Sequence, residues 1–434
     1  MHTIHSGFTV AVEIKDNQSA NLRNVLIKLN GNGNGNLSIF NNSETTLFVS
    51  GVILPRQYYH REWLPETFVF ATTYCGPLAD HLSDLIRTNK KHLCELFSYC
   101  KHTEGSLVDE NSLIYYLKSH SYKSAFNSRY NCITKQDVEK EKKLRHEIEN
   151  YIDKAQSLHA FDNLSAVEVK TLIQRHIATR GDDYEWAHKP AVKTVLEYCM
   201  INRAPIISSF LLLILIAFLW RNPKYIVRFS TLFVAACLLL WVTIYYIARG
   251  KHDTAIRPSD DSIRQIAATQ IHPILNEMTA AAPLKKGRLR RFFYAFALRI
   301  ARFIAPFVMK VPTVSSLRWL VIDKSKRLLF ISNYANTTDF YVRDFLVGNT
   351  PKGVNFMFTH GQGFPDAKML IKGGITDHPE GYMNAVHTGQ HVTDLWYAHE
   401  PNLTADIINK NREIRNGLFK QMTEEKAKKW LKLL

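Results

Sequence analysis

Two uncharged apolar runs, standing almost side by side, constrain this chain more than any other feature. The first reads IISSFLLLILIAFLW at positions 206–220, and the second occupies positions 229–248. A helix needs about 20 apolar residues to cross a bilayer, and Arg203 and Arg221 can extend the first run by reaching towards the headgroups. The pattern predicts a two-helix transmembrane hairpin over residues 204–248. A buried helical hairpin in a soluble protein is the alternative.

The part of the chain before this hairpin has the pattern of a small α+β domain. Expected strands and helices alternate in the order strand–helix–strand–strand–helix–strand, which is the split βαβ order of a ferredoxin-like fold. The strands fall at 7–15, 46–54, 67–74 and 125–129, and the helices at 18–29, 77–99 and 134–152.

The part after the hairpin repeats the same order. Strands are expected at 269–277, 316–322, 327–334, 355–359 and 393–398, and helices at 289–309, 339–346, 379–387 and from Thr404 onwards. The repeat is also visible in letters, because FVFATTY at 68–74 lies over LLFISNY at 328–334. A second match, between the segments that begin at Ile133 and Leu403, follows in the same order.

These observations predict an α+β fold made of two ferredoxin-like βαββαβ repeats that pair into a dimeric α+β barrel-like unit. The expected organisation is a first repeat over 1–152, a helical linker over 153–203, the hairpin over 204–248, a linker over 249–262, and a second repeat with a C-terminal helix over 263–434. A capping box formed by Ser165 and Glu168 is expected to begin a helix inside the first linker.

The formal net charge of +16 is concentrated near the hairpin. Residues 285–310 carry eight basic side chains and no acid. Beside a membrane segment, this cluster predicts contact with the lipid bilayer and its anionic headgroups rather than with nucleic acid. The arginines expected at the membrane surface are Arg290, Arg291, Arg299 and Arg302. Basic residues beyond both ends of the hairpin predict a multi-pass protein of the cell inner membrane, with its soluble domains in the cytoplasm.

The basic helix expected over 289–309 has two interpretations. As the first helix of the second repeat, it should pack Phe292, Phe296, Ile300 and Phe303 onto its own sheet. As an interfacial helix, it would lay the same face in the membrane. The repeat favours the first interpretation.

Several motifs in the second half resemble an uncharacterised bacterial family. Its hallmarks are T-[IV]-H-F-A-R-W, L-L-F-x-S-N-Y-D-G, G-F-P, W-Y-S-A-Y-P and L-T-x-x-x-I-x-x-N-x-x-I-R-x-G-L. The corresponding letters here are TVSSLRW at 313–319, LLFISNYAN at 328–336, GFP at 363–365, WYAHEP at 396–401 and the segment 403–418. The first half is similar to that family's N-terminal repeat through Gly76, Leu78, His81, Leu82 and Cys100. The chain departs from the family at Ser315, which replaces a histidine, and at Ala335 and Asn336, which replace an acid and a glycine.

This resemblance implies the dimeric α+β barrel group, to which the dye-decolourising haem peroxidases belong. Haem is therefore the cofactor to consider, with His360 as the candidate axial ligand because it precedes a glycine-containing turn. The G-x-x-D-G motif of those peroxidases is absent, since the nearest segment, FDNL at 161–164, lacks both glycines. No metal site is predicted.

Three further residues are candidates for a catalytic site. Arg318 lies within an apolar strand, where a charge is costly unless it is paired. It is expected either to meet Asp323, Asp339 or Asp344 or to face a ligand. Asn333 and Tyr334 end a strand just before a helix, where a capping asparagine and a core tyrosine are the alternative.

Three classes of function follow from these features. The first is a membrane-anchored module that binds a small apolar or lipid-derived ligand at the cytoplasmic membrane face. The second is a haem-dependent, peroxidase-like oxidoreductase. The third is an enzyme or carrier that acts on a lipid-derived substrate. The sequence leaves open whether the chain is an enzyme.

Overall fold

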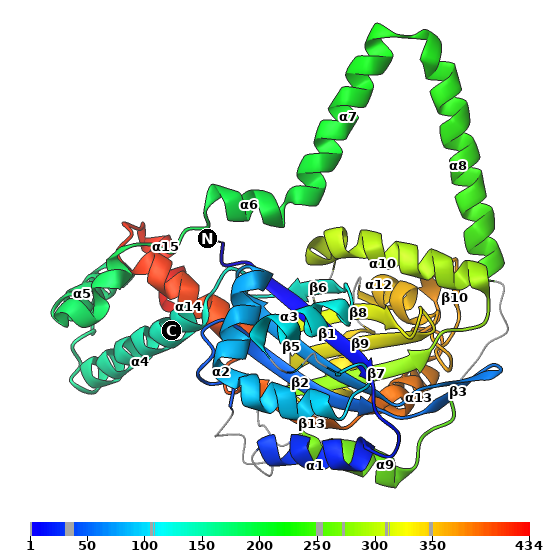
Figure 1. Ribbon diagram of the computed structural model, residues 1–434. Helices are drawn as coiled ribbons and strands as arrows, with labels where there is room; N and C mark the ends of the chain where they lie inside the picture. The colour runs from blue at the N-terminus through cyan, green and yellow to red at the C-terminus, as the bar shows by residue number, and fades with distance from the viewer. Residues whose placement is uncertain are drawn as a thin grey trace.

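The computed structural model describes residues 2–30, 39–104, 107, 109–248, 255–270, 274–308, 311, 313–346 and 350–434. Within these residues the chain has a mixed α+β fold, as the sequence predicts, and its sheets are antiparallel (Figure 1). The strands are β1 (His5–Glu13), β2 (Thr46–Leu54), β3 (Gln57–Tyr59), β4 (Glu62–Leu64), β5 (Thr67–Cys75), β6 (Ala125–Ser128), β7 (Leu275–Pro283), β8 (Val314–Ile322), β9 (Arg327–Ala335), β10 (Ala367–Lys368), β11 (Lys372–Gly373), β12 (Gln390–His391) and β13 (Thr393–Ala398).

The helices cover the outer faces of the sheets and also form two projections. They are α1 (Ser19–Leu29), α2 (Leu78–Ser98), α3 (Glu110–Ser119), α4 (Lys135–Ser157), α5 (Ala166–Ala178), the 3-10 helix η2 (Gly181–His188), α6 (Val195–Ile201), α7 (Arg203–Arg221), α8 (Lys224–Ala248), α9 (Asp260–Thr269), α10 (Arg288–Val308), α11 (Thr338–Asp344), α12 (Thr350–Phe358), α13 (Pro379–Gly389), α14 (Ala405–Leu418) and α15 (Glu424–Leu431).

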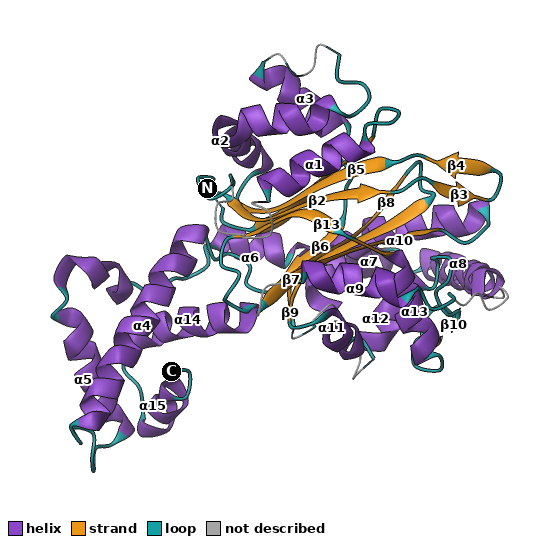
Figure 2. Ribbon diagram, turned by 90° about the horizontal axis from the view of Figure 1, so that it is seen from below, coloured by secondary structure: helices purple, strands orange, loops and turns teal. Residues whose placement is uncertain are grey.

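Two main sheets stand face to face. One has the strand order β1-β5-β2-β13 and the other β12-β7-β9-β8-β6. Their inner faces share an apolar cluster that includes Val52 and Val69 from the first sheet and Leu320 and Ile331 from the second. Helices α1, α2 and α3 cover the outer face of the first sheet, and α10 to α13 cover the outer face of the second (Figure 2). The core therefore has four layers, helix–sheet–sheet–helix.

The two halves of the chain exchange strands. Strand β6, from before the hairpin, pairs with β8, while β13, from the end of the chain, pairs with β2. The short strands β12 and β13 are separated only by Val392, yet they lie in different sheets. Neither half can complete its sheet alone, and the expected boundary between the soluble halves is not a boundary between their sheets.

The central strands are apolar because they are buried on both faces. Every residue of β2, β5, β7 and β9 is buried, which explains why most of their residues are apolar or small and do not alternate with polar ones. Two expectations are wrong. Residues 355–359, expected to be a strand, lie mostly in helix α12, and the strand expected at 269–277 begins only at Leu275.

A helical lobe projects from one end of the sheets and contains α4, α5, α14 and α15 (Figure 1). The predicted capping box of Ser165 and Glu168 begins α5, which confirms that prediction. Gly417 lets α14 approach the indole of Trp430, because a Cβ at position 417 would lie 2.3 Å from the Trp430 ring.

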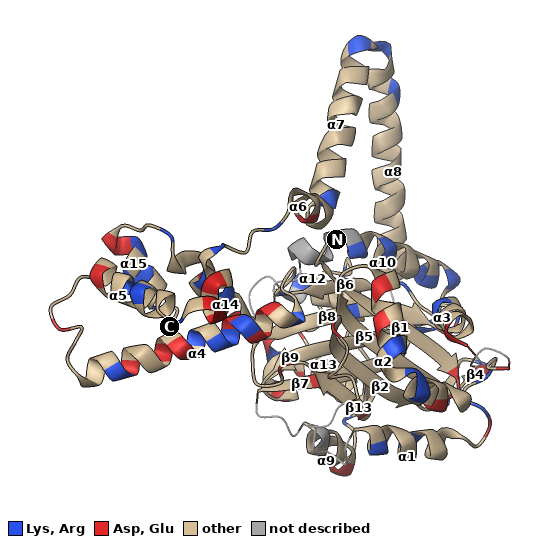
Figure 3. Ribbon diagram, turned by 60° about the vertical axis from the view of Figure 1, so that its left-hand side comes forward, with Lys and Arg blue, Asp and Glu red and all other residues tan. Residues whose placement is uncertain are grey.

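The apolar helices α7 and α8 project together from the body, joined at a basic tip (Figure 3). Among the described helices, only α8 is by itself long and apolar enough to cross a membrane. Helices α6 and α7 meet the same criterion only as a pair bent by 75°. Length and composition thus support one candidate membrane span. They do not support the expected two-helix transmembrane hairpin or the expected multi-pass localisation.

Candidate functional site

Arg318 lies between the two sheets rather than at a ligand site. Its guanidinium donates from β8 to the carbonyl oxygens of Phe8 and Thr72, at 3.1 and 2.9 Å, and to the hydroxyl groups of Thr9 and Thr73. The side chain is 2% exposed. Of the two alternatives that the sequence offers for Arg318, the pairing with Asp323, Asp339 or Asp344 is not found. The strand instead directs the side chain across the interior to the opposite sheet.

Glu277 on β7 is the acidic group that interacts with Arg318. Its carboxylate accepts hydrogen bonds from the hydroxyl groups of Thr279 and Thr393. Burial raises the pKa of Glu277 from 4.5 to about 7, and these hydrogen bonds and Arg318 only partly offset that effect. Arg318 and Glu277 are therefore two buried groups of opposite charge type in the interior of the sandwich.

Asn333 and Tyr334 are also interior residues. The Asn333 amide donates to the hydroxyl of Ser316 at 3.1 Å and accepts from the indole N–H of Trp396 at 2.9 Å. The Tyr334 ring stacks on Tyr341 with a centroid distance of 4.1 Å. Both side chains are at most 1% exposed. These contacts connect β9 to its neighbours and leave no face open to a substrate.

His360 lies in the turn that follows α12, in an aromatic enclosure. The rings of Phe293, Tyr294 and Phe356 lie 6.2, 4.6 and 6.1 Å from its imidazole, measured between centroids. Burial lowers its pKa to about 3, and the residue is 0% exposed. An axial ligand needs an open face against which the haem plane can lie. The packing around His360 leaves no such space, so these residues do not fit a haem.

The four arginines expected at the membrane surface separate into different environments. Arg291 is half-buried and Arg299 is exposed on α10. Arg290 is buried and donates to the carbonyl oxygens of Ile247 and Thr359. Arg302 lines a cleft beneath α6. The Arg290 side chain thus holds the last turn of α8 against α10 instead of facing outwards.

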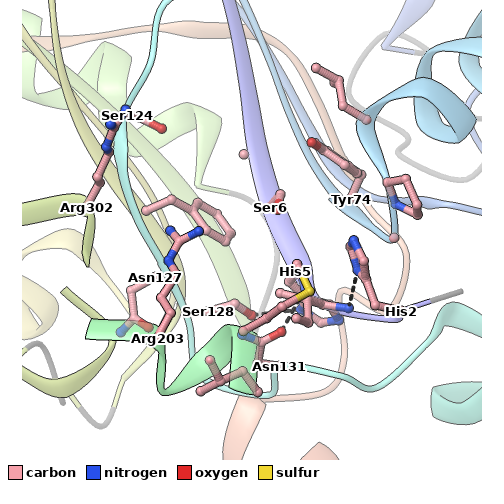
Figure 4. A pocket seen from close by; sticks show the side chains of 18 of the residues that line it. His2, His5, Ser6, Tyr74, Ser124, Asn127, Ser128, Asn131, Arg203 and Arg302 are labelled. Carbon is pink, nitrogen blue, oxygen red and sulfur yellow. Dashed lines mark hydrogen bonds between the residues drawn. The ribbon is translucent and has the colours of Figure 1, made fainter. Parts of the chain in front are cut away.

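That cleft, which we call the α6 cleft, is a candidate binding site. It has a volume of about 370 Å³. Its walls are formed by three strand segments, which are the start of β1, the end of β5, and β6 with its flanking residues, and by parts of four helices, which are the start of α2, α6, the first residue of α7 and a later turn of α10. Arg203 and Arg302 lie on one side, and His2 and Tyr74 lie on the other (Figure 4). The cleft is therefore located at the base of α7.

Polar side chains form much of the α6 cleft. Arg203, Arg302 and Lys123 contribute cationic groups, Asn127 and Asn131 contribute amides, and no carboxylate occurs among the described lining residues. Arginine guanidinium groups and amide donors at one site are the usual partners of phosphate and carboxylate oxygens. The electrostatics of the α6 cleft favour an anionic ligand.

His5, one of the two histidines among the described residues that line the α6 cleft, has a structural role. His5 uses Nε2 to donate to the carbonyl oxygen of Ile133 at 2.8 Å, so its Nδ1 accepts from the hydroxyl of Ser128 at 2.9 Å. Burial lowers the His5 pKa to about 4, and the ring is neutral at ordinary pH. Because both nitrogens are engaged, His5 is not positioned to take a proton from a ligand.

Most residues of this cleft could not be found from sequence. Arg203 and Arg302 belong to basic segments noticed for their position near the hairpin. Tyr74 ends the repeated segment at 68–74, but that repeat indicates no binding site, and His2 and Asn127 carry no local motif. They come from segments separated by dozens of positions and meet only because β1 lies beside β5 and β6. Patterns of residue spacing within one helix or strand cannot show that residues from separate segments meet in one cleft.

The turns that follow β5 and β9 share a left-handed backbone conformation. Gly76 has φ +95°, and Asn336, at the matching position after β9, has φ +74°. Asparagine tolerates this left-handed conformation better than most residues, so Asn336 can occupy after β9 the position that Gly76 occupies after β5. Ser315 lies at an irregularity of register between Val314 and Ser316 and is buried.

Comparison of the chain with family models, with curated proteins and with solved structures finds no match. Among the described residues, no three histidine, cysteine or acidic side chains are grouped so that they could hold a metal ion.

Proposed function

We propose that this chain is a membrane-anchored binding protein for a small, anionic, lipid-derived ligand. The observation that carries the proposal is the α6 cleft, whose cationic wall is formed partly by the first residue of an apolar helix. A ligand with an acyl chain and an acidic headgroup would match this arrangement, because its headgroup would reach Arg203 and Arg302 while its chain remained beside α7.

The proposal includes a membrane hairpin in which α7 and α8 enter the bilayer together. The exchange of β6 and β13 supports this, because it requires both soluble halves to be on one side of the membrane. A single crossing by α8 would separate β8 from β6. The bent pair of α6 and α7 can supply the second crossing, which brings both soluble halves to the same side of the bilayer. The basic flanks favour the cytoplasmic side.

We further propose that the two halves are ferredoxin-like repeats with exchanged fourth strands, joined into a barrel-like unit. The orders β1-β5-β2 and β7-β9-β8 follow the same pattern, and the paired registers β1–β5 and β7–β9 have the same length. The haem-dependent alternative is not carried forward, because the surroundings of His360 do not fit the cofactor.

Titration calorimetry tests the ligand proposal with the full chain in a neutral detergent. Lysophosphatidylglycerol, which is anionic, should bind, and lysophosphatidylcholine, which is zwitterionic, should bind more weakly. Removing one charge-assisted contact costs about 1.5–3 kcal/mol, so Arg203→Gln and Arg302→Gln should each weaken binding by about tenfold or more.

The matched control is Arg221→Gln, which removes the same charge from the far end of α7. Equal affinity of the parent chain and the two cleft variants for lysophosphatidylglycerol would contradict the proposal. Equal losses in all three variants would indicate general charge attraction and would also contradict it.

A further inference from the structure

Helix α10 exposes an apolar stripe where the sequence pattern predicts a buried face. Leu289, Phe292, Phe296 and Ile300, which we call the α10 stripe, have exposed fractions of 45, 71, 50 and 46%. Their spacing places them on one side of the helix. The face that packs on the sheet consists instead of Tyr294, Ala297, Leu298 and Ala301. Phe303 lies outside the residues whose side chains are described.

Basic side chains border the α10 stripe. Arg288, Arg291 and Arg299 lie on the same helix, and Lys324 approaches from the turn between β8 and β9. Together with Phe292 and Phe296, they line a shallow cleft of about 370 Å³. Exposed aromatic residues flanked by arginine and lysine are typical of helices that lie in a membrane interface.

The position of α10 shows which side of the body the α10 stripe is on. Its first turn is joined to the end of α8 by the hydrogen bond from Arg290 to the carbonyl oxygen of Ile247. Further along, its Arg302 shares the α6 cleft with Arg203 at the start of α7. Helix α10 thus runs between the bases of both apolar helices (Figure 1). Its buried face is on the sheet, so the α10 stripe is on the side from which α7 and α8 leave the body.

We propose that the α10 stripe is a second membrane-contact surface, which lies in the interface of an anionic lipid leaflet. The aromatic and aliphatic side chains enter the acyl boundary, and Arg288, Arg291 and Arg299 meet lipid phosphates. The contact fixes the body against the bilayer, with the α6 cleft beside the lipid surface. This inference rests on the membrane anchorage in the proposed function but not on ligand binding in the cleft.

Fluorescence quenching in vesicles tests the inference with the full chain. The exposed cysteines are first removed by Cys199→Ser and Cys237→Ser, and Phe296→Cys then carries an environment-sensitive nitrobenzoxadiazole label. The chain is reconstituted into phosphatidylcholine vesicles with or without phosphatidylglycerol. The label should emit at shorter wavelength in the anionic vesicles and be quenched by lipids brominated on their acyl chains.

The matched control carries the label through Ile27→Cys, on α1, at the opposite side of the body. Ile27 is 42% exposed, so it resembles Phe296 in exposure but not in position. Its label should be quenched by iodide in the water and not by brominated lipid. In the Phe296→Cys chain, Arg288→Gln, Arg291→Gln and Arg299→Gln together should remove the difference between anionic and neutral vesicles.

Three results would overturn the inference. A label at position 296 that is quenched by iodide as readily as the label at position 27 would leave the α10 stripe in water. A label shielded from both quenchers, with shielding that rises with protein concentration, would assign the surface to a second copy of the chain. Release of the chain from vesicles by alkaline carbonate would remove the anchorage itself, and the proposed function would fail with it.

Discussion

At the scale of single residues, the interior of the sandwich contains two ionisable side chains, Arg318 and Glu277, where apolar residues are usual. Arg318 satisfies its donors on the opposite sheet, and Gly7 makes room for it, since a Cβ at position 7 would lie 3.1 Å from its guanidinium carbon. Such buried groups are costly to disrupt because removing one partner leaves the others without compensation. Arg318 therefore contributes to the alignment of the two sheets.

Glu277 should make stability depend on pH. Its pKa is raised from 4.5 to about 7 in the folded chain, so between these values the folded state holds a proton that the unfolded state has lost. The free energy of unfolding should therefore fall as pH rises through this window, by on the order of 3 kcal/mol. Glu277→Gln should remove this component and stabilise the chain above pH 7. Thermal unfolding in detergent on both sides of the window measures it, and an unchanged pH profile in the variant would contradict the assignment.

Removing Arg318 should destabilise the fold strongly. Arg318→Ala leaves two buried carbonyl oxygens without this donor and removes the cation that acts on Glu277, and a loss of about 3–5 kcal/mol is expected. Arg318→Lys keeps the charge but offers fewer directed donors, so its loss should be smaller. Chemical denaturation measures both. Arg264→Ala, at a side chain that is 80% exposed, is the control and should change stability by less than about 0.5 kcal/mol.

At the scale of elements, the apolar helices differ from the rest of the molecule in what surrounds them. Leu213 on α7 and Leu239 on α8 are 64 and 69% exposed, and the two helices diverge from their common tip (Figure 1). Exposed apolar surface of this extent is unfavourable in water. A bilayer around both helices would remove that cost without requiring them to pack on each other.

Charges placed in either apolar helix should weaken membrane retention. An arginine near the centre of a spanning helix costs about 2.5–3.5 kcal/mol on insertion. The pairs Leu212→Arg with Leu213→Arg, and Leu239→Arg with Leu240→Arg, should each shift the chain into the soluble fraction on alkaline carbonate extraction. Leu158→Arg, outside the hairpin, should not. Retention of the α7 variant beside release of the α8 variant would refute the two-helix insertion.

At the scale of the whole molecule, the exchanged strands make one folding unit from two halves. Without the second half of the chain, the edge of β2 would lack the partner that β13 supplies, and β6 would have no sheet to join. Unpaired sheet edges favour aggregation. The hairpin is therefore an insertion between two segments that depend on each other, not a linker between independent domains.

Residues 1–152 should not fold when they are expressed alone. We expect an insoluble or non-cooperatively unfolding fragment, because its sheet would end at the bare edge of β2. Co-expression with residues 255–434 should produce a soluble complex, since the second fragment supplies β13 and receives β6. Circular dichroism during thermal unfolding is the measurement. A single cooperative transition of the first fragment alone would show that the strand exchange is dispensable.

The sequence by itself determined the local features of this protein. The α+β class, the strands β2, β5, β9 and β13, the cap of α5 and the apolar character of α7 and α8 all follow from periodicity, run length and capping, which act between near neighbours. Where local pattern was ambiguous, the sequence failed, as at α12, whose apolar residues suit a strand or a buried helix equally.

Only the tertiary structure decided which residues meet. It moved Arg318, Asn333 and Tyr334 into the interior, enclosed His360 in aromatic rings, turned Phe292 and Phe296 outwards and assembled the α6 cleft from distant segments. The physical reason is strand exchange between the halves: pairing across more than a hundred positions determines which face of each element is covered, and no local pattern carries that information.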